Sequence, residues 1–140
     1  MRFYLILSTA LLSLHVTGVA ACGYCVEDKI AAVYDFAIVT QALDRQHHVA
    51  FFAIAGNLAP SDGARRALEI VAESATGVDK GSVKVSIESA TLALAFDPKR
   101  WALTDVQQAL AQKLAAKKLA LQPLRIIDQS RQMKVIDAKQ

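Results

Sequence analysis

The sequence predicts an α+β domain in which four antiparallel strands carry two helices on one face, in the order strand, helix, strand, strand, helix, strand. Three observations lead to this prediction. Residues 49–56, VAFFAIAG, form a short apolar and aromatic run closed by glycine, which is typical of a buried strand. Residues 82–88 and 91–96 alternate in polarity, which indicates two half-buried strands of one hairpin. Residues 62–75 and the stretch from Thr104 to Leu114 repeat apolar side chains at three- and four-residue steps, the period of a helix.

Residues 1–21 are expected to be removed from the mature protein, because they have the order of a secretory signal peptide. Arg2 is followed by the apolar run LILSTALLSL and then by the small-residue stretch TGVAAC. This succession of charge, apolar core and small residues is the pattern of such signals. The apolar core is shorter than the roughly 20 residues that a membrane-spanning helix needs. We therefore predict an exported protein.

The mature chain is nearly neutral, which argues against a nucleic-acid partner. The full sequence has 16 basic and 13 acidic residues, and loss of Arg2 with the signal leaves 15 against 13, a net charge of +2. Nucleic-acid-binding proteins instead gather basic residues on one face or along one helix. The densest basic run, Lys113, Lys117 and Lys118, is typical of a solvated helix face.

Residues 22–46 are predicted to form an N-terminal helix ahead of the domain. From Val26 to about Arg45, apolar residues recur mostly at three- and four-residue steps. Glu27 and Asp28 in the first turn and Arg45 in the last have the charges that the helix dipole favours at each end. The domain itself is then expected to span residues 47–128.

Capping residues predict where the two helices of the domain begin. Ser61 or Asp62 is expected to cap the first helix, after the turn that contains Asn57. Thr104, with Gln107 three residues later, has the spacing of a capping box and is expected to open the second.

The end of the chain is predicted to form an edge strand and a tail. The run LALQPLRIID contains Pro123, which has no N–H to donate to a central ladder, so this strand is expected at the edge of the sheet. Residues 129–140 form a tail that would add a short strand or remain mobile.

The segment from Gly77 to Leu110, GVDKGSVKVSIESATLALAFDPKRWALTDVQQAL, resembles the second half of heavy-metal-associated domains. These are small metallochaperone and P-type ATPase modules with a ferredoxin-like βαββαβ fold. Phe96-Asp97-Pro98 followed by a capped helix is the most specific part of the resemblance. It implies a ferredoxin-like antiparallel sheet with two helices, preceded here by the extra N-terminal helix.

The resemblance also implies a place for metal, which this chain does not fill. In the family, a C-x-x-C on the loop between the first strand and the first helix binds Cu(I) or Zn(II). Here the loop reads AGNLAPSDGAR and has no cysteine, histidine or methionine. The resemblance therefore implies the fold and leaves metal homeostasis or a protein contact derived from it as the expected role.

Cys22 and Cys25 are the only cysteines, and their C-x-x-C spacing leaves several interpretations open. The run Val19-Ala20-Ala21-Cys22 looks like a bacterial lipobox, which predicts lipidation of Cys22 and a membrane anchor. Free thiolates of Cys22 and Cys25 would instead bind a soft ion, Cu or Zn. Export would also allow a plain disulfide between them. CGYC is similar to an active-site sequence of thioredoxin-fold disulfide isomerases, so thiol–disulfide exchange is a further alternative.

His47 and His48 stand between the N-terminal helix and the first strand, and we interpret them as boundary residues rather than ligands. About 20 residues of predicted helix, roughly 30 Å, would separate them from Cys25. Trp101 is expected to cover one end of the core. No grouping of serine, histidine and carboxylate has supporting motif context, so no catalytic residue is predicted.

The sequence as a whole predicts a non-catalytic protein of the bacterial envelope, either periplasmic or anchored as a lipoprotein. Its expected role is a metal-homeostasis or protein-interaction module with an envelope protein as partner. The alternatives are a genuine Cu or Zn protein that uses Cys22 and Cys25, and a thiol–disulfide oxidoreductase.

Overall fold

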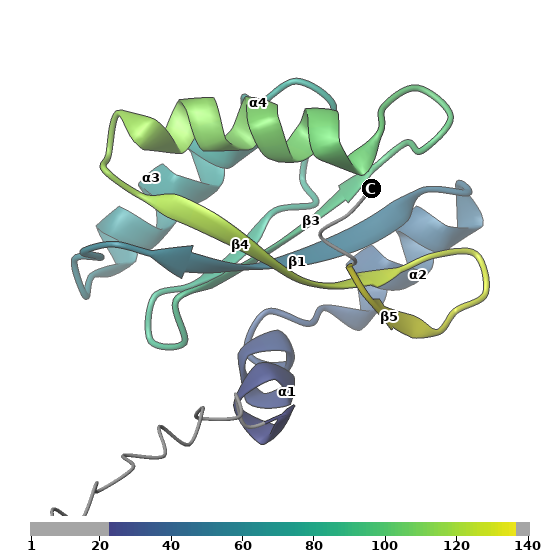
Figure 1. The fold of residues 1–140 in the computed structure, drawn as a ribbon, viewed down its shortest axis with the longest axis horizontal. Helices are drawn as coiled ribbons and strands as arrows, with labels where there is room; N and C mark the ends of the chain where they lie inside the picture. The colour runs from purple at the N-terminus through teal and green to yellow at the C-terminus, as the bar shows by residue number, and fades with distance from the viewer. Residues whose placement is uncertain (1–22, 137–140) are drawn as a thin grey trace, which may run out of the picture.

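The computed structural model describes residues 23–136, in which one mixed α/β unit is built around an antiparallel sheet (Figure 1). The predicted signal peptide, residues 1–21, and Cys22 lie outside the described residues. None of the helices in residues 23–136 has the length and apolar character needed to cross a membrane. The elements are α1 (Gly23–Ala31), α2 (Phe36–Asp44), β1 (His48–Ala55), α3 (Asp62–Glu73), β2 (Lys84–Ser86), β3 (Thr91–Phe96), α4 (Leu103–Ala115), β4 (Ala120–Ile127) and β5 (Met133–Val135).

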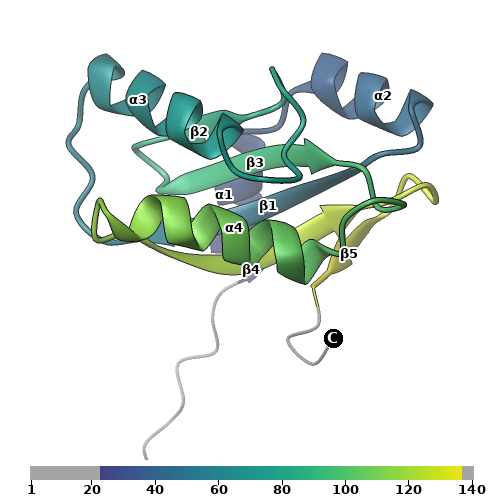
Figure 2. The ribbon, with the colours of Figure 1, turned by 90° about the horizontal axis from the view of Figure 1, so that it is seen from above.

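The sheet has the strand order β2-β3-β1-β4-β5, and all its neighbouring pairs are antiparallel. The order of β1, α3, β2, β3, α4 and β4 confirms the predicted α+β, ferredoxin-like arrangement. Strand β5, which lies in the predicted tail, adds to the outside of this sheet. Seen from above, α3 lies toward β2 and α4 toward β4 (Figure 2).

Each face of β1 packs into its own apolar cluster, because successive side chains of a strand point to opposite faces. Phe52 is fully buried in the cluster under α3 and α4, together with Leu94 and Leu110. Phe51 is fully buried in the cluster under α1 and α2, together with Val39. The sheet is therefore covered on both faces, which explains why β1 and β3 are buried along nearly their whole length.

The prediction of one helix over residues 22–46 is wrong, because the chain breaks after Ala31 into two helices. Asp35 has extended backbone angles and its side chain accepts a hydrogen bond from the Ile38 N–H, at 3.1 Å. Aspartate favours such a capping position over a helix interior, since its side chain replaces the missing backbone partner. The break lets Ile30 and Leu43, one from each helix, enter the same apolar cluster.

The predicted cap of the first domain helix is confirmed and that of the second is wrong. Ser61 caps α3, and its hydroxyl accepts a hydrogen bond from the Ala64 N–H at 3.1 Å. Helix α4 begins one residue before Thr104, and its N-cap residue Ala102 provides no side-chain hydrogen bond. The turn after Asp97 fixes the chain at this point, because the Trp101 N–H donates to the Asp97 carbonyl at 3.0 Å.

The prediction that the last strand forms the sheet edge is wrong for one half of β4. Residues 125–127 pair with β5 on their outer side. The half that contains Pro123 has no strand on its outer side among residues 23–136, as the missing N–H of proline requires. The pairing with β1 shifts by one residue between Phe51 and Phe52, which leaves Leu124 as the extra residue of a bulge.

Candidate functional site

The loop between β1 and α3, where the resemblance places the metal, is an ordinary helix entry in this chain. Ser61 uses its hydroxyl to cap α3, and Asp62 is exposed at the first turn of the helix. Asn57 is exposed on the same loop. The loop positions provide no thiolate, imidazole or thioether for a soft ion.

The cysteine pair stays a prediction. Cys25 belongs to the first turn of α1, which begins at Gly23, and Cys22 lies before the described residues. Lipidation, a disulfide and metal binding therefore all remain predictions for Cys22 and Cys25.

His47 lies between the carboxylates of two loops, those of Asp79 and Asp97. Its Nδ1 lies 2.5 Å from Oδ2 of Asp79, and its Nε2 lies 4.0 Å from Oδ2 of Asp97. The two carboxylates thus approach opposite nitrogens of one ring, so the three side chains cannot converge on a single ion. Among residues 26–136, whose side chains the structure describes, no group of three or more His, Cys, Asp or Glu side chains could hold a metal.

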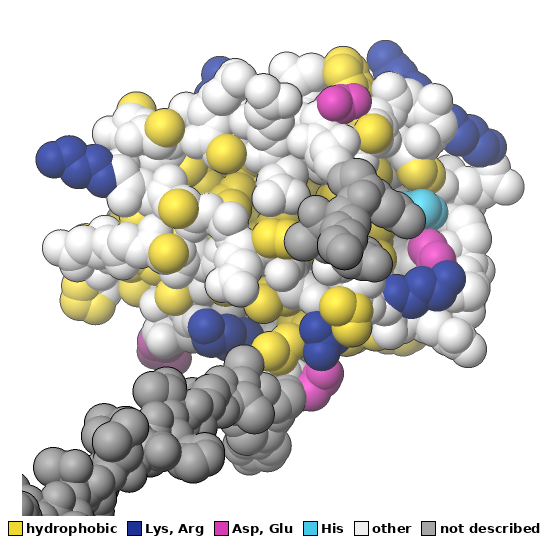
Figure 3. All heavy atoms as spheres, in the orientation of Figure 1, with side chains coloured by type: hydrophobic (Ala, Val, Ile, Leu, Met, Phe, Trp, Pro, Cys, Tyr) yellow, Lys and Arg dark blue, Asp and Glu magenta, His cyan; other side chains and the backbone are white. Residues whose placement is uncertain are grey.

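A wide groove lies between α4 and the strands β4 and β5, and it is the strongest candidate for a functional site (Figure 3). Its volume of about 970 Å³ is at the upper end of the usual range for ligand pockets. Hydrophobic side chains gather on this face of the molecule, between α4 and β4. The lining residues are His48, Phe96, Pro98, Trp101, Ala102, Leu103, Thr104, Gln107, Gln108, Ala111, Pro123, Ile126, Asp128, Lys134, Val135 and Ile136.

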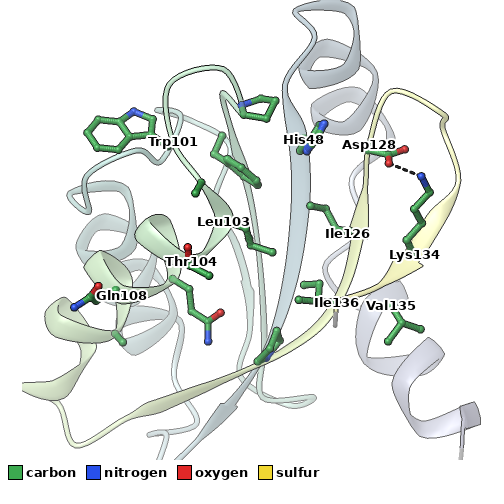
Figure 4. A pocket seen from close by; sticks show the side chains of 16 residues that line it. His48, Trp101, Leu103, Thr104, Gln108, Ile126, Asp128, Lys134, Val135 and Ile136 are labelled. Atoms are coloured by element: carbon green, nitrogen blue, oxygen red, sulfur yellow. Dashed lines mark hydrogen bonds and ion pairs between the residues drawn. The ribbon is translucent and has the colours of Figure 1, made fainter. Parts of the chain in front are cut away.

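One end of the groove is polar and carries a self-paired charge. Lys134 Nζ lies 2.6 Å from Oδ2 of Asp128 (Figure 4). Ser130 donates to Asp128 Oδ1 from its hydroxyl and its backbone N–H, at 2.6 and 2.9 Å. The hydrogen bond from Lys134, followed by those from Ser130, holds the pKa of Asp128 well below the ordinary value of 3.8. The two opposite charges therefore offset each other and leave the groove without net charge.

His48 is the titratable side chain at the end of β1 in this groove. Its ring meets Phe96 edge to face, with 5.7 Å between the ring centroids. Burial is the largest influence and lowers the pKa of His48 below the ordinary value of 6.5. The negative charge of Asp128 raises this pKa, whereas Lys134 and His47 lower it further. The neutral imidazole is thus favoured in the folded protein.

Stability is expected to fall on acidification because of His48. The unfolded chain takes up the proton first, so the contribution is complete above about pH 6.5 and is lost as the pH drops through that value. Urea unfolding between about pH 5 and 8 should show this decline, and His48→Gln should flatten it. An unchanged slope in the variant would contradict the assignment. Asp128 does not contribute to this decline, because its lowered pKa affects stability only at a pH below the ordinary aspartate value of 3.8.

The sequence did not predict this groove, although seven of its lining residues enter the sequence predictions for other reasons: His48, Phe96, Pro98, Trp101, Thr104, Gln107 and Pro123. Trp101 was expected to cover the core, and it does pack against the cluster under α3 and α4 while also lining the groove. His48 was interpreted as a boundary residue, and Pro123 as the mark of an edge strand. Strand β5 is one of the two alternatives predicted for the tail, and the alternation of Met133 and Val135 with polar neighbours is the local signal for it.

Comparison with solved structures finds likeness to metal-binding domains at low sequence identity. Oxidized MerP from Ralstonia metallidurans CH34 is 16% identical, covers 55% of this chain and 96% of its own, and has a TM-score of 0.43. A copper binding domain from HMA7, a P-type ATPase, is 14% identical over 55% and 93% of the two chains, with a TM-score of 0.43. The N-terminal domain of a potential copper-translocating P-type ATPase from Bacillus subtilis is 18% identical over 55% and 86%, with a TM-score of 0.41.

The likeness to these three structures covers about half of this chain. No family model matches the chain. No curated protein matches it either.

Proposed function

We propose that this chain is an exported, non-catalytic module of the bacterial envelope that serves metal homeostasis or protein interaction by holding a partner protein in the groove between α4 and β4–β5. The groove itself is the observation that carries the proposal. It is open, largely apolar and without net charge, since its two charged side chains, Asp128 and Lys134, pair with each other. Exposed apolar patches of this kind are typical of protein-interaction sites.

The β1–α3 loop supports a protein contact over metal binding at the position implied by the resemblance. Its loop residues contain no soft-metal ligand, and Ser61 is committed to capping α3. A metal bound there would need oxygen ligands alone, which suit hard cations and not Cu(I). The fold would thus be retained while its usual metal chemistry is not.

The N-terminal sequence supports the proposed location. Arg2, the apolar run LILSTALLSL and the stretch TGVAAC predict export, and Cys22 in its lipobox context is the proposed site of lipidation. A lipid on Cys22 would hold the mature protein at a membrane surface, whereas an unmodified chain would be periplasmic.

Site-specific photo-crosslinking in the native envelope tests the proposed contact. A photoreactive residue replaces Gln107, which lines the groove, or Gln112, which is exposed on the same helix outside it. We expect a discrete adduct with one partner protein from position 107 and none from position 112. Equal adducts from both positions, or none from position 107, would contradict a contact in the groove.

A second candidate function is soft-metal binding by Cys22 and Cys25. It is favoured by the C-x-x-C spacing of the pair, since two thiolates at this spacing can bind a soft ion such as Cu(I). This function requires an unmodified Cys22. Stoichiometric uptake of Cu(I) or Zn(II) by the mature protein under reducing conditions, abolished in Cys25→Ser, would support it. Failure of the mature protein to bind either metal would exclude this function. Thiol–disulfide exchange by Cys22 and Cys25 is a separate alternative, and it would require a measurable rate of exchange.

A further inference from the structure

The sheet ends on both sides in a strand of three residues, and the first of these, β2, is anchored by packing. Val85, its central residue, is 6% exposed and belongs to the apolar cluster under α3 and α4. The Val85 N–H also donates to Oε1 of Glu69, a residue of α3, at 3.3 Å. Burial of an apolar side chain stabilises such a strand beyond its backbone pairing. β2 is therefore expected to open only when the cluster itself opens.

The strand on the other side, β5, has no comparable anchor. Its three residues are all exposed, and Val135 is 68% exposed where Val85 is 6%. The two apolar clusters of the described residues include neither Met133 and Val135 nor the half-buried Ile136. β5 is thus attached to the sheet mainly by its pairing with residues 125–127 of β4.

Polar contacts at the surface join the C-terminal arm, which we define as residues 129–136, to the rest of the domain. They are the ion pair of Lys134 with Asp128 at 2.6 Å, the ion pair of Arg131 with Asp44 at 3.5 Å, and a hydrogen bond from Nε2 of Gln129 to the His47 carbonyl at 3.2 Å. The side chains of Arg131 and Asp44 are both exposed. Exposed ion pairs contribute little to stability, because water solvates and screens each partner. The arm is therefore held more weakly than β2.

The C-terminal arm also forms one wall of the groove. Lys134, Val135 and Ile136 line the groove from the arm, and Ile136 projects toward α4 (Figure 4). Ile126 lines the groove from the part of β4 that pairs with the arm. Separation of the arm from β4 would carry Ile136 away and would widen the groove beside Ile126.

We propose that the C-terminal arm is a movable wall of the groove, which separates from β4 while the rest of the sheet stays folded and thereby controls access to the groove. Regions with few buried apolar contacts open locally, at a cost below that of global unfolding. The control of access rests on the proposed function, whereas the separate opening of β5 rests on packing alone. Two different measurements therefore distinguish them.

Native-state hydrogen exchange, followed by NMR, tests the separate opening of β5 on the full mature chain. After correction for intrinsic rates, the paired amides of residues 133–135 should exchange at least about tenfold faster than those of residues 84–86. The rate for β5 should not change in low concentrations of urea, because local opening exposes little new surface. The rate for β2 should rise with urea together with that for β1. A urea dependence of β5 equal to that of β1 would overturn the separate opening.

Each edge strand also carries one lysine in an ion pair, which provides a matched pair of variants. Lys134→Gln removes the pair with Asp128, so the β5 amides should exchange about two- to fivefold faster. Lys84→Gln removes the pair with Asp35, at 3.4 Å, but leaves Val85 in the cluster, so exchange of the β2 amides should change by less than about twofold. Equal effects on the two strands would contradict the difference in anchoring.

A reversible disulfide in the full mature chain tests the control of access. Arg125 and Val135 are directly opposite partners on β4 and β5, at a spacing that a disulfide can bridge. Arg125→Cys and Val135→Cys are combined with Cys25→Ser and with the photoreactive residue at position 107, and peptide mass spectrometry confirms the new disulfide. Oxidation should reduce the adduct from position 107 by about tenfold or more, because the open state is then removed. Reduction of the same preparation should restore the adduct.

Equal adducts from the oxidised and the reduced protein would overturn the control of access and leave the proposed function standing. Absence of the adduct from position 107 in both forms, and in the chain with its native residues at 25, 125 and 135, would remove the proposed function and the control of access together. The exchange experiment would still decide whether β5 opens alone, since it needs no partner.

Discussion

Replacement of Phe52 by alanine is expected to lower the free energy of unfolding by about 3 to 5 kcal/mol, the usual cost of removing a buried phenylalanine ring. Phe52 is 0% exposed and lies on the central strand β1, in the cluster that joins the sheet to α3 and α4. Strands β3 and β4 fix it on both sides through its pairing with Leu92 and Pro123. The surroundings therefore have little freedom to fill the cavity.

Phe36→Ala is the matched control for this prediction. Phe36 is 74% exposed at the start of α2, so the same substitution there should change stability by less than about 0.5 kcal/mol. Urea unfolding followed by circular dichroism measures both variants. Similar losses in the two variants would contradict the placement of Phe52 in the core.

Gly56→Ala is expected to destabilise the protein by about 2 to 4 kcal/mol, because backbone strain and steric overlap act together. Gly56 has a φ of +130°, which side chains rarely adopt. A Cβ there would lie 2.8 Å from the Lys118 carbonyl oxygen and 2.7 Å from Cδ2 of Leu119. The side chain could move, but the carbonyl belongs to the backbone that leads into β4. The end of β1 would therefore have to shift.

Gly63→Ala controls for the loss of a glycine as such. Gly63 lies in the first turn of α3, and a Cβ there meets nothing within 4 Å. Because alanine also favours a helix, this variant should be unchanged or more stable by up to about 1 kcal/mol. Thermal unfolding of the two variants should move in different directions. A common loss would show that the close approach at Gly56 does not matter.

The elements with strong local patterns could be predicted from the sequence. The VAFFAIAG run, the hairpin of residues 82–96 and the serine cap at Ser61 each have a signal within a few residues, and the structure has an element at each place. The prediction of a half-buried second hairpin strand is wrong, because β3 is covered on both faces and is buried along its whole length. Periodicity alone failed across residues 22–46, since apolar spacing continues through the break and conceals the cap at Asp35. For residues 129–140 the sequence left a short strand and a mobile tail as alternatives, because three residues are too few to establish a period, and the structure has the short strand β5.

The candidate site could not be predicted, because it depends on contacts between distant parts of the chain. His47 and Asp79 are 32 residues apart, and no local pattern joins them. The groove forms between α4 and the strands β4 and β5, where the three-residue β5 covers only part of the eight-residue β4. It therefore depends on the relative lengths of these elements and on how they pack together. The resemblance to heavy-metal-associated domains placed the expected site on the β1–α3 loop, and the C-x-x-C spacing pointed to Cys22 and Cys25. Neither observation predicts a site between α4 and the strands β4 and β5.

The most direct test of the account is crosslinking from position 107 after metal has been removed from the envelope preparation by a chelator. If the partner is held by the groove, the adduct forms in the same yield with and without metal, and Ala111→Arg abolishes it. An adduct that disappears with the metal and returns when Cu or Zn is restored would contradict a metal-independent contact in the groove.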